Sequence, residues 1–139
     1  MKKTIFTISI LICLSACRSS NPFKYNNHLD LAYMIKLYQD NGYKTTNEYR
    51  PAVPKTLYVD GTLAMQVGSR FLVFYKLNAD SPDALKTLKR VKKNGFIKIM
   101  ALTRKAVVNG SFIMWGFEGH EDEDKIVKIF KDFNLDVIY

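Results

Sequence analysis

The sequence predicts an α+β domain, because stretches with strand-like and helix-like apolar spacing follow one another along most of the chain. Short runs of β-branched and aromatic residues, such as residues 71–74 and 112–115, are typical of strands. Other stretches repeat apolar residues every three or four positions, as amphipathic helices do. Glycines beside asparagine, aspartate or serine separate these stretches and predict tight turns. We therefore expect short strands that meet at turns and form a sheet on which helices pack.

The first 16 residues have the pattern of a signal peptide. Lys2 and Lys3 precede an uncharged and mostly apolar stretch from Thr4 to Leu14. A helix of that length is too short to cross a bilayer. Residues 1–16 are therefore predicted to be a signal peptide that is removed, and not a membrane anchor.

The residues Leu14-Ser15-Ala16-Cys17 resemble the lipobox of bacterial lipoproteins, in which small residues precede an obligatory cysteine. The resemblance implies cleavage between Ala16 and Cys17, a diacylglycerol on the Cys17 thiol, and a fatty acyl chain such as palmitate on the new amino group. Two or three acyl chains bind a membrane stably. The alternative is an ordinary secretory signal whose cysteine later enters a disulfide. Because cleavage also removes Cys13, the mature chain would have one cysteine and no disulfide partner.

The residue after the cysteine is Arg18. In Gram-negative lipoproteins an aspartate at this place directs retention in the inner membrane. The resemblance therefore implies a lipid anchor in the outer membrane, with the protein on its periplasmic face.

The charge of the chain is positive and suggests anionic partners. Lysines and arginines number 21 against 13 acidic residues, and the formal net charge of +8 becomes +6 when Lys2 and Lys3 leave with residues 1–16. The remaining 123 residues suffice for one hydrophobic core. A basic envelope protein is expected to meet anionic headgroups, acidic polymers or an acidic protein. Export argues against nucleic acid as a partner.

The segment 17–27 is polar, contains one proline and lacks an apolar period, so it is predicted to be a flexible tether. Residues 28–139 are predicted to be a single α+β periplasmic domain. The domain is expected to begin with a helix over residues 28–41. Asn27 is placed to cap this helix and Asn41-Gly42 to end it.

A short β-hairpin is predicted next. Residues 43–49 could form an edge strand, and Pro51 and Pro54 interrupt the chain after it. Two short strands over residues 57–59 and 63–67 flank Asp60-Gly61, which is a hairpin turn signal. Gly68-Ser69 predicts a second turn before a strand over residues 70–77.

The next helix has clear boundary signals. Ser81 is a capping residue, Pro82 occupies the first helical position, and Asn94-Gly95 ends the helix. Its apolar stripe leaves a candidate contact face for an anionic surface or an acidic partner, formed by Lys86, Lys89, Arg90 and Lys93. The alternative is an ordinary solvated helix face.

The last third of the chain predicts strands, a hairpin turn and a helix. Residues 96–102 are expected to be a strand, and residues 107–108 and 112–117 flank Asn109-Gly110, the strongest hairpin signal in the chain. A helix over residues 121–133 starts with carboxylates that favour the positive end of its dipole. Residues 135–139 are expected to be a terminal strand.

An internal similarity suggests the arrangement of these elements. With an offset of 41, the strand at 71–74 falls on the strand at 112–115, and the two helices that follow also align. Two such halves give the order βαββαβ over about residues 70–139, with both helices on one face because parallel crossovers are right-handed. The prediction is a ferredoxin-like sheet, preceded by the helix at 28–41 and the short hairpin. Apolar residues on both faces of the strands indicate that the helix at 28–41 covers the second face or that this face is a binding groove.

Residues 70–139 also resemble, more weakly, a SPOR domain. The resemblance rests on the strand, acidic loop, helix and Lys92-Lys93-Asn94-Gly95 exit of the first half, and on Trp115-Gly116-Phe117 before an acidic helix in the second. It departs from that family at residues 76–79, where a glycine-containing turn is usual. The resemblance implies binding of peptidoglycan glycan strands that lack their peptides.

No pattern in the sequence predicts catalysis or a metal site. His28 and His120 are isolated and are expected to be exposed residues at helix starts. The acidic residues from Glu118 to Asp124 do not have the spacing of an EF-hand loop. We therefore expect no enzyme activity, no cofactor and no metal.

Three functions stay open. The leading interpretation is a lipid-anchored, non-enzymatic subunit or pilot of an envelope machine, such as a secretion, pilus or conjugation apparatus, with an envelope protein as its partner. The second is SPOR-like binding of peptidoglycan. The third is an inhibitor or exclusion lipoprotein that blocks an incoming partner.

Overall fold

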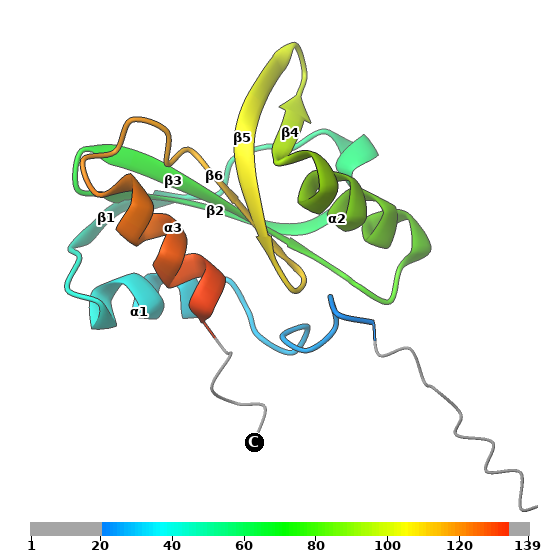
Figure 1. Cartoon of the computed structure of the whole chain (residues 1–139), viewed down its shortest axis with the longest axis horizontal. Coiled ribbons are helices and arrows are strands. Elements are labelled where there is room, and N and C mark those ends of the chain that lie inside the picture. The colour runs from blue at the N-terminus through cyan, green and yellow to red at the C-terminus, as the bar shows by residue number, and fades with distance from the viewer. Residues whose placement is uncertain (1–20, 134–139) are drawn as a thin grey trace, which may run out of the picture.

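The computed structural model describes residues 21–133, which form an α+β domain built on one antiparallel sheet (Figure 1). The sheet has six strands in the order β1-β2-β3-β6-β5-β4. The strands are β1 Thr45–Tyr49, β2 Val59–Val67, β3 Arg70–Leu77, β4 Phe96–Ile99, β5 Leu102–Asn109 and β6 Phe112–Trp115. The helices are α1 Ala32–Asp40, α2 Pro82–Asn94 and α3 Glu123–Asp132, with a short 3₁₀ turn η1 at Lys55–Leu57. The predicted α+β class is confirmed.

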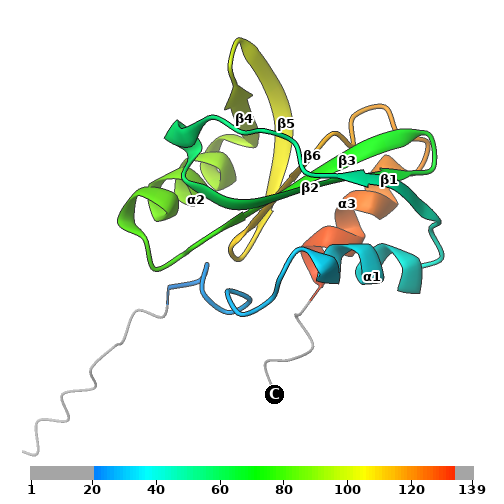
Figure 2. The same cartoon turned by 180° about the vertical axis from the view of Figure 1, so that it is seen from behind.

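Helices cover both faces of the sheet (Figures 1 and 2). On one face, Val73 and Tyr75 of β3 pack with Leu88 of α2. On the other, Leu72 and Phe74 pack with residues of α1 and α3. Successive residues of β3 therefore enter two different cores, as the strand's period of two requires. This explains why β3 is apolar at odd and even positions alike.

The ferredoxin-like arrangement is not confirmed. It required α2 and α3 on one face of the sheet, but the two helices lie on opposite faces, and α3 shares its face with α1. The reason is strand direction. β3 is antiparallel to β6, β6 to β5, and β5 to β4, so β3 and β4 run in opposite directions and α2 is not a parallel crossover. The predicted terminal strand at 135–139 lies outside the described residues.

The N-terminal helix and the edge strand are confirmed with shorter bounds. α1 begins at Ala32 with no side-chain cap, so Asn27 does not cap it. The helix ends at Asn41 and Gly42, and Gly42 has a φ of 88°. β1 is one edge of the sheet, as predicted.

The predicted hairpin at Asp60-Gly61 is wrong. β2 runs without a turn from Val59 to Val67, and the irregularity at Asp60 is a bulge in its pairing with β3. A Cβ atom on Gly61 would lie 3.0 Å from Leu31 Cδ1. The glycine therefore permits the close approach of the chain before α1, and it does not mark a turn.

The other turn signals are confirmed. Gly68 and Ser69 join β2 to β3, and Gly110 lies in the turn between β5 and β6. α2 begins at the Ser81 cap, whose hydroxyl accepts a bond from the Ala84 N–H (3.5 Å), and it ends at Gly95. The strand predicted at 96–102 is two strands, because the chain turns at Met100 and starts β5 at Leu102.

Residues Asn21–Asn27, here called the entry segment, are packed on the domain. Phe23 and Asn26 are buried. Asn21 Nδ2 donates to the Ala79 carbonyl (3.2 Å), and Asn26 Nδ2 donates to the Asn109 carbonyl (3.0 Å). The predicted tether at 17–27 is therefore corrected for these seven residues, because their side chains bind the domain. The rest of it lies outside the described residues.

Within residues 21–133, none of the helices has the length and apolar character needed to span a bilayer.

Candidate functional site

The β4–β5 hairpin projects from the body of the domain (Figures 1 and 2). It carries three exposed apolar side chains. Met100 at its turn is 79% exposed, Leu102 is 57% exposed, and Phe96 at its base is 50% exposed. Exposed apolar side chains that are gathered on one projecting element, and not scattered singly, are typical of an interaction site.

A groove of about 580 Å³ lies between this hairpin, the C-terminal half of α2 and η1. α2 contributes Arg90, Val91 and Asn94 to its lining. The other side is formed by β4 and β5, and η1 closes one end with Thr56 and Leu57. The lining thus combines buried apolar residues, such as Val91 and Ile97, with exposed polar and cationic residues, such as Asn94 and Arg90.

Of the four predicted basic residues, Arg90 lines this groove. Lys86, Lys89, Arg90 and Lys93 are all exposed, and their spacing places them on one side of α2. Lys86 Nζ lies 3.6 Å from Asp83 Oδ1. Among the described residues, no ion pair is formed by Lys89, Arg90 or Lys93. Their charges are free to meet an external anion.

Sequence reasoning missed the contribution of the hairpin. Lys98 lines the groove opposite Arg90 and shares its strand face with Thr103 and Lys105. The available signal was the run Phe96–Leu102, in which apolar residues lie at both odd and even positions around a single lysine. The run was predicted to be one strand of the sheet, but it forms β4, the turn at Met100 and the start of β5, and Phe96, Met100 and Leu102 are exposed.

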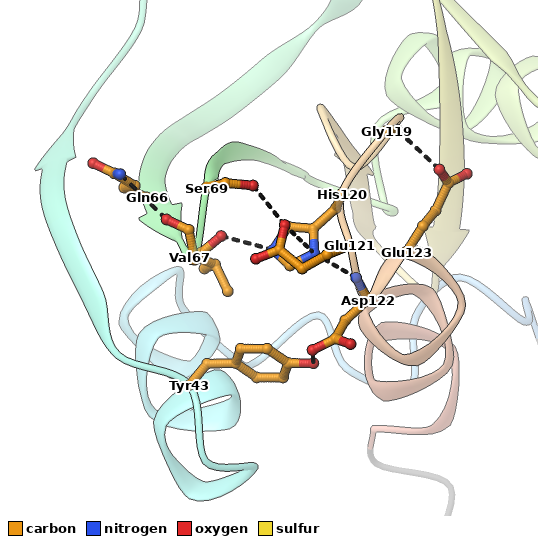
Figure 3. Close-up of polar contacts among 10 residues, drawn as sticks. Tyr43, Gln66, Val67, Ser69, Gly119, His120, Glu121, Asp122 and Glu123 are labelled. Carbon is orange, nitrogen blue, oxygen red and sulfur yellow. Dashed lines mark hydrogen bonds and ion pairs between the residues drawn. The ribbon is translucent and has the colours of Figure 1, made fainter.

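A cluster of polar residues surrounds His120, away from the β4–β5 hairpin and its groove (Figure 3). The Asp122 backbone N–H donates to His120 Nδ1 (2.9 Å), and His120 Nε2 donates to the Val67 carbonyl (2.8 Å). These bonds assign the neutral imidazole with its hydrogen on Nε2. His120 was expected to be exposed, but it is buried, because its ring fills the space between the β2–β3 turn and the start of α3.

The neighbours of His120 also hold structural elements together (Figure 3). Ser69 Oγ donates to Glu121 Oε2 (2.5 Å), and this hydrogen bond lowers the pKa of the exposed Glu121 carboxyl. The Tyr43 hydroxyl donates to Asp122 Oδ2 (2.9 Å). Burial, together with this bond to Asp122, raises the pKa of Tyr43 to about 12. Both ring nitrogens of His120 take part in hydrogen bonds within the protein, so the His120 side chain links the end of β2 to the start of α3.

The acidic residues at 118–124 point to different partners. The Lys105 N–H donates to Glu118 Oε2 (3.3 Å), and the Gly119 N–H donates to Glu123 Oε2 (2.9 Å). Between residues 21 and 133, no group of three histidine, cysteine or acidic side chains is placed to hold a metal ion.

An aromatic surface, formed by the exposed Tyr49 and Phe71 and the half-buried Trp115, lies on the face of the sheet that α2 covers only in part. Tyr49 pairs with Ala64, Ala64 with Val73, and Val73 with Trp115, so these residues share one face. The rings of Tyr49 and Phe71 meet edge to face with centroids 5.8 Å apart. Phe71 and Trp115 line a hollow of about 220 Å³ with Arg70, Arg104 and Glu118.

The predicted cleavage and lipid-attachment residues, Ala16 and Cys17, lie outside the described residues. His28 is exposed and precedes α1, as expected. Comparisons of the chain with protein-family models, with curated proteins and with solved structures found no match.

Proposed function

We propose that the protein is a lipid-anchored, non-enzymatic binding module of the bacterial outer membrane, which docks an envelope protein on its periplasmic face. The lipobox at residues 14–17 supports the anchor. The partner surface is the β4–β5 hairpin with the adjoining groove. The observation that carries the proposal is the combination of exposed Phe96, Met100 and Leu102 with two cations that line the groove, Arg90 and Lys98. Within residues 21–133 neither cation forms an ion pair.

The interaction is expected to be with a protein that carries negative charge. Apolar anchors surrounded by charge are the usual anatomy of a protein interface. Free cations beside the groove would steer an acidic partner and would bind an uncharged polymer no better than any other surface. The proposed role is therefore that of a subunit or pilot of a larger envelope assembly.

Metabolic labelling with palmitate tests the anchor. The unaltered chain and Cys13→Ser are expected to incorporate label and to sediment with outer membranes, because Cys13 is lost with the signal peptide. Cys17→Ser is expected to incorporate none. Label that persists in Cys17→Ser would overturn the proposed anchor.

Binding of peptidoglycan glycan is a second candidate, favoured by the aromatic surface. Sugar rings stack on exposed aromatic side chains, and Arg104 supplies a neighbouring hydrogen-bond donor. A pull-down with amidase-treated sacculi tests this function. Phe71→Ala should abolish retention of the protein, whereas Tyr58→Ala, which removes an exposed aromatic ring elsewhere, should leave retention unchanged. If the unaltered protein is not retained, this candidate is rejected.

A further inference from the structure

β4 ends the sheet and leaves backbone groups unpaired on its outer side. The Ala106 N–H donates to the Gly95 carbonyl (3.0 Å), so this pair belongs to the hydrogen-bonded positions of the β4–β5 ladder. Hydrogen-bonded and non-bonded pairs alternate in antiparallel strands. The N–H and C=O groups of Phe96 and Lys98 must therefore point away from β5. Among residues 21–133, no group bonds to them.

The groove lies along this open edge. Phe96 and Lys98 line it directly, so their outward backbone groups face the same space as the apolar Leu57 and Val91. A free strand edge beside an apolar groove is the surface that accepts an extended peptide as an added strand. Short edge strands and lysines discourage unspecific pairing, and β4 has both, with four residues and Lys98. A strand that pairs with β4 should therefore be short and should carry a charge opposite to that of Lys98.

A second copy of the chain is disfavoured by charge. Two β4 edges that pair would bring Lys98 and Arg90 of one copy against the same cations of the other. Like charges that meet in a strand pair are destabilising. The matching occupant is an extended segment with acidic side chains on one face, which would meet Lys98, and apolar side chains on the other, which would meet Val91 and Leu57.

We propose that an extended, acidic segment of a partner protein adds to the sheet along β4 and places its apolar side chains in the groove. The inference rests on the proposed binding function and specifies its recognition mode. Recognition then combines main-chain hydrogen bonds with charge complementarity, and helical or folded partner surfaces would not fit it.

Peptide binding tests the inference. The protein is the full chain with Cys17→Ser, so that the result does not depend on lipidation. The probe is a capped hexapeptide in which glutamate alternates with valine and isoleucine, and the matched control replaces glutamate by lysine. We expect the acidic peptide alone to bind and to slow amide hydrogen exchange at Phe96 and Lys98 by about tenfold or more, with little change at Ile97 and Ile99.

Two substitutions of Lys98 distinguish the contribution of its backbone N–H to peptide binding from the contribution of its side chain. Lys98→Pro removes an N–H that the β4–β5 ladder does not use, and it should weaken binding about tenfold. Lys98→Ala keeps the N–H and should weaken binding only a few-fold. If Lys98→Pro does not fold, the exchange measurement on the unsubstituted strand still decides the question.

Three results would overturn the inference: no binding of the acidic peptide, binding without slower exchange at Phe96 and Lys98, or binding of phosphatidylglycerol vesicles in place of the peptide. The last result would assign the apolar tip of the hairpin to a lipid surface. Failure of palmitate labelling would reject the anchor and would leave this peptide result unaffected.

Discussion

Single buried polar residues hold the entry segment to the domain. Asn26 Oδ1 accepts from the Ser111 N–H (2.8 Å), and Lys76 Nζ donates to the carbonyls of Asn26 (3.2 Å) and Asn27 (2.9 Å) and to Ser111 Oγ (2.6 Å). Asn109 extends this network to the last turn of α3, where its amide donates to the Phe130 carbonyl (2.7 Å). A buried polar group that lacks a hydrogen-bond partner lowers the stability of the fold. Loss of one member of this network would therefore destabilise the protein, because the remaining members would stay buried without partners.

The titration of Lys76 provides a prediction at the residue scale. Burial lowers the pKa of Lys76 to about 8, although the charge of Asp60 acts in the opposite direction. An unfolded lysine keeps its proton up to a pKa of 10.5, so between these values the unfolded chain binds more protons than the folded one. The free energy of unfolding should therefore rise with pH across this window.

We expect the unfolding free energy to increase, relative to Lys76→Met, by about 1 kcal/mol between pH 8 and pH 10.5, since Lys76 is only half-buried and is screened by solvent. Denaturant titrations of both proteins at matched pH values measure the difference. A difference that is constant or falls with pH would contradict the lowered pKa.

The burial and contacts of single side chains were the features that the sequence predicted least. Nothing in the spacing of Asn26 or His120 indicates that these side chains are buried, because Asn109 lies 83 positions from Asn26 and Val67 lies 53 positions from His120. The basic residues of α2 could be predicted, because an amphipathic helix shows its exposed side in its own period. The cations and apolar residues that complete the groove come from a different element.

Elements with local boundary signals were predicted well. α2 has a capping serine, a proline at its first position and a glycine at its end, and all three act as expected. β2 was not predicted well, since Gly61 was interpreted as a turn when its role is to admit Leu31. A glycine in a sequence can indicate a close contact that leaves no room for a side chain, or a backbone with a positive φ. Only the segments that pack around the glycine show which of these roles it has.

Two glycines provide a matched test at the scale of elements. Gly95 and Gly110 both have a positive φ, of 71° and 56°. A Cβ atom on Gly95 would meet no atom within 4 Å, whereas one on Gly110 would overlap the Asn26 side chain. Gly95→Ala is therefore expected to cost about 1 kcal/mol of stability, from backbone strain alone.

Gly110→Ala should cost more, about 2 to 3 kcal/mol, because it also displaces Asn26 and with it the entry segment. Thermal denaturation measures both changes, and proteolysis before Asn27 should accelerate only in Gly110→Ala. Equal costs for the two substitutions would show that Asn26 does not pack as described.

At the scale of the whole molecule, the entry segment and the projecting hairpin lie at opposite ends of β5. Asn26 binds Asn109, the last residue of β5, and the hairpin turn adjoins Leu102, the first. The four residue steps from Cys17 to Asn21 span at most about 14 Å, whereas β5 alone is roughly 23 Å long. A lipid on Cys17 would therefore hold the entry end near the bilayer and direct the hairpin away from it.

Fluorescence quenching tests this orientation in the lipidated protein. After cleavage and lipidation, an introduced cysteine is the only free thiol, so Met100→Cys and Asn78→Cys can each carry one label. Brominated lipids should quench the label at position 78, beside the Asn21 contact with Ala79, several-fold more than the label at position 100. Equal quenching would mean that the entry segment leaves the domain when the protein is anchored.

The sequence by itself determined the α+β class, the bounds of α2, the turns at Gly68 and Gly110, and the basic face of α2. It also carries the whole argument for the lipid anchor. These features depend on residues that are close together in the chain, where period, caps and motifs act directly. The tertiary structure decided the strand directions, the opposite faces of α2 and α3, the burial of the entry segment and the open edge of β4. Each of these depends on which distant segments pair, and pairing is set by the packing of both sheet faces at once.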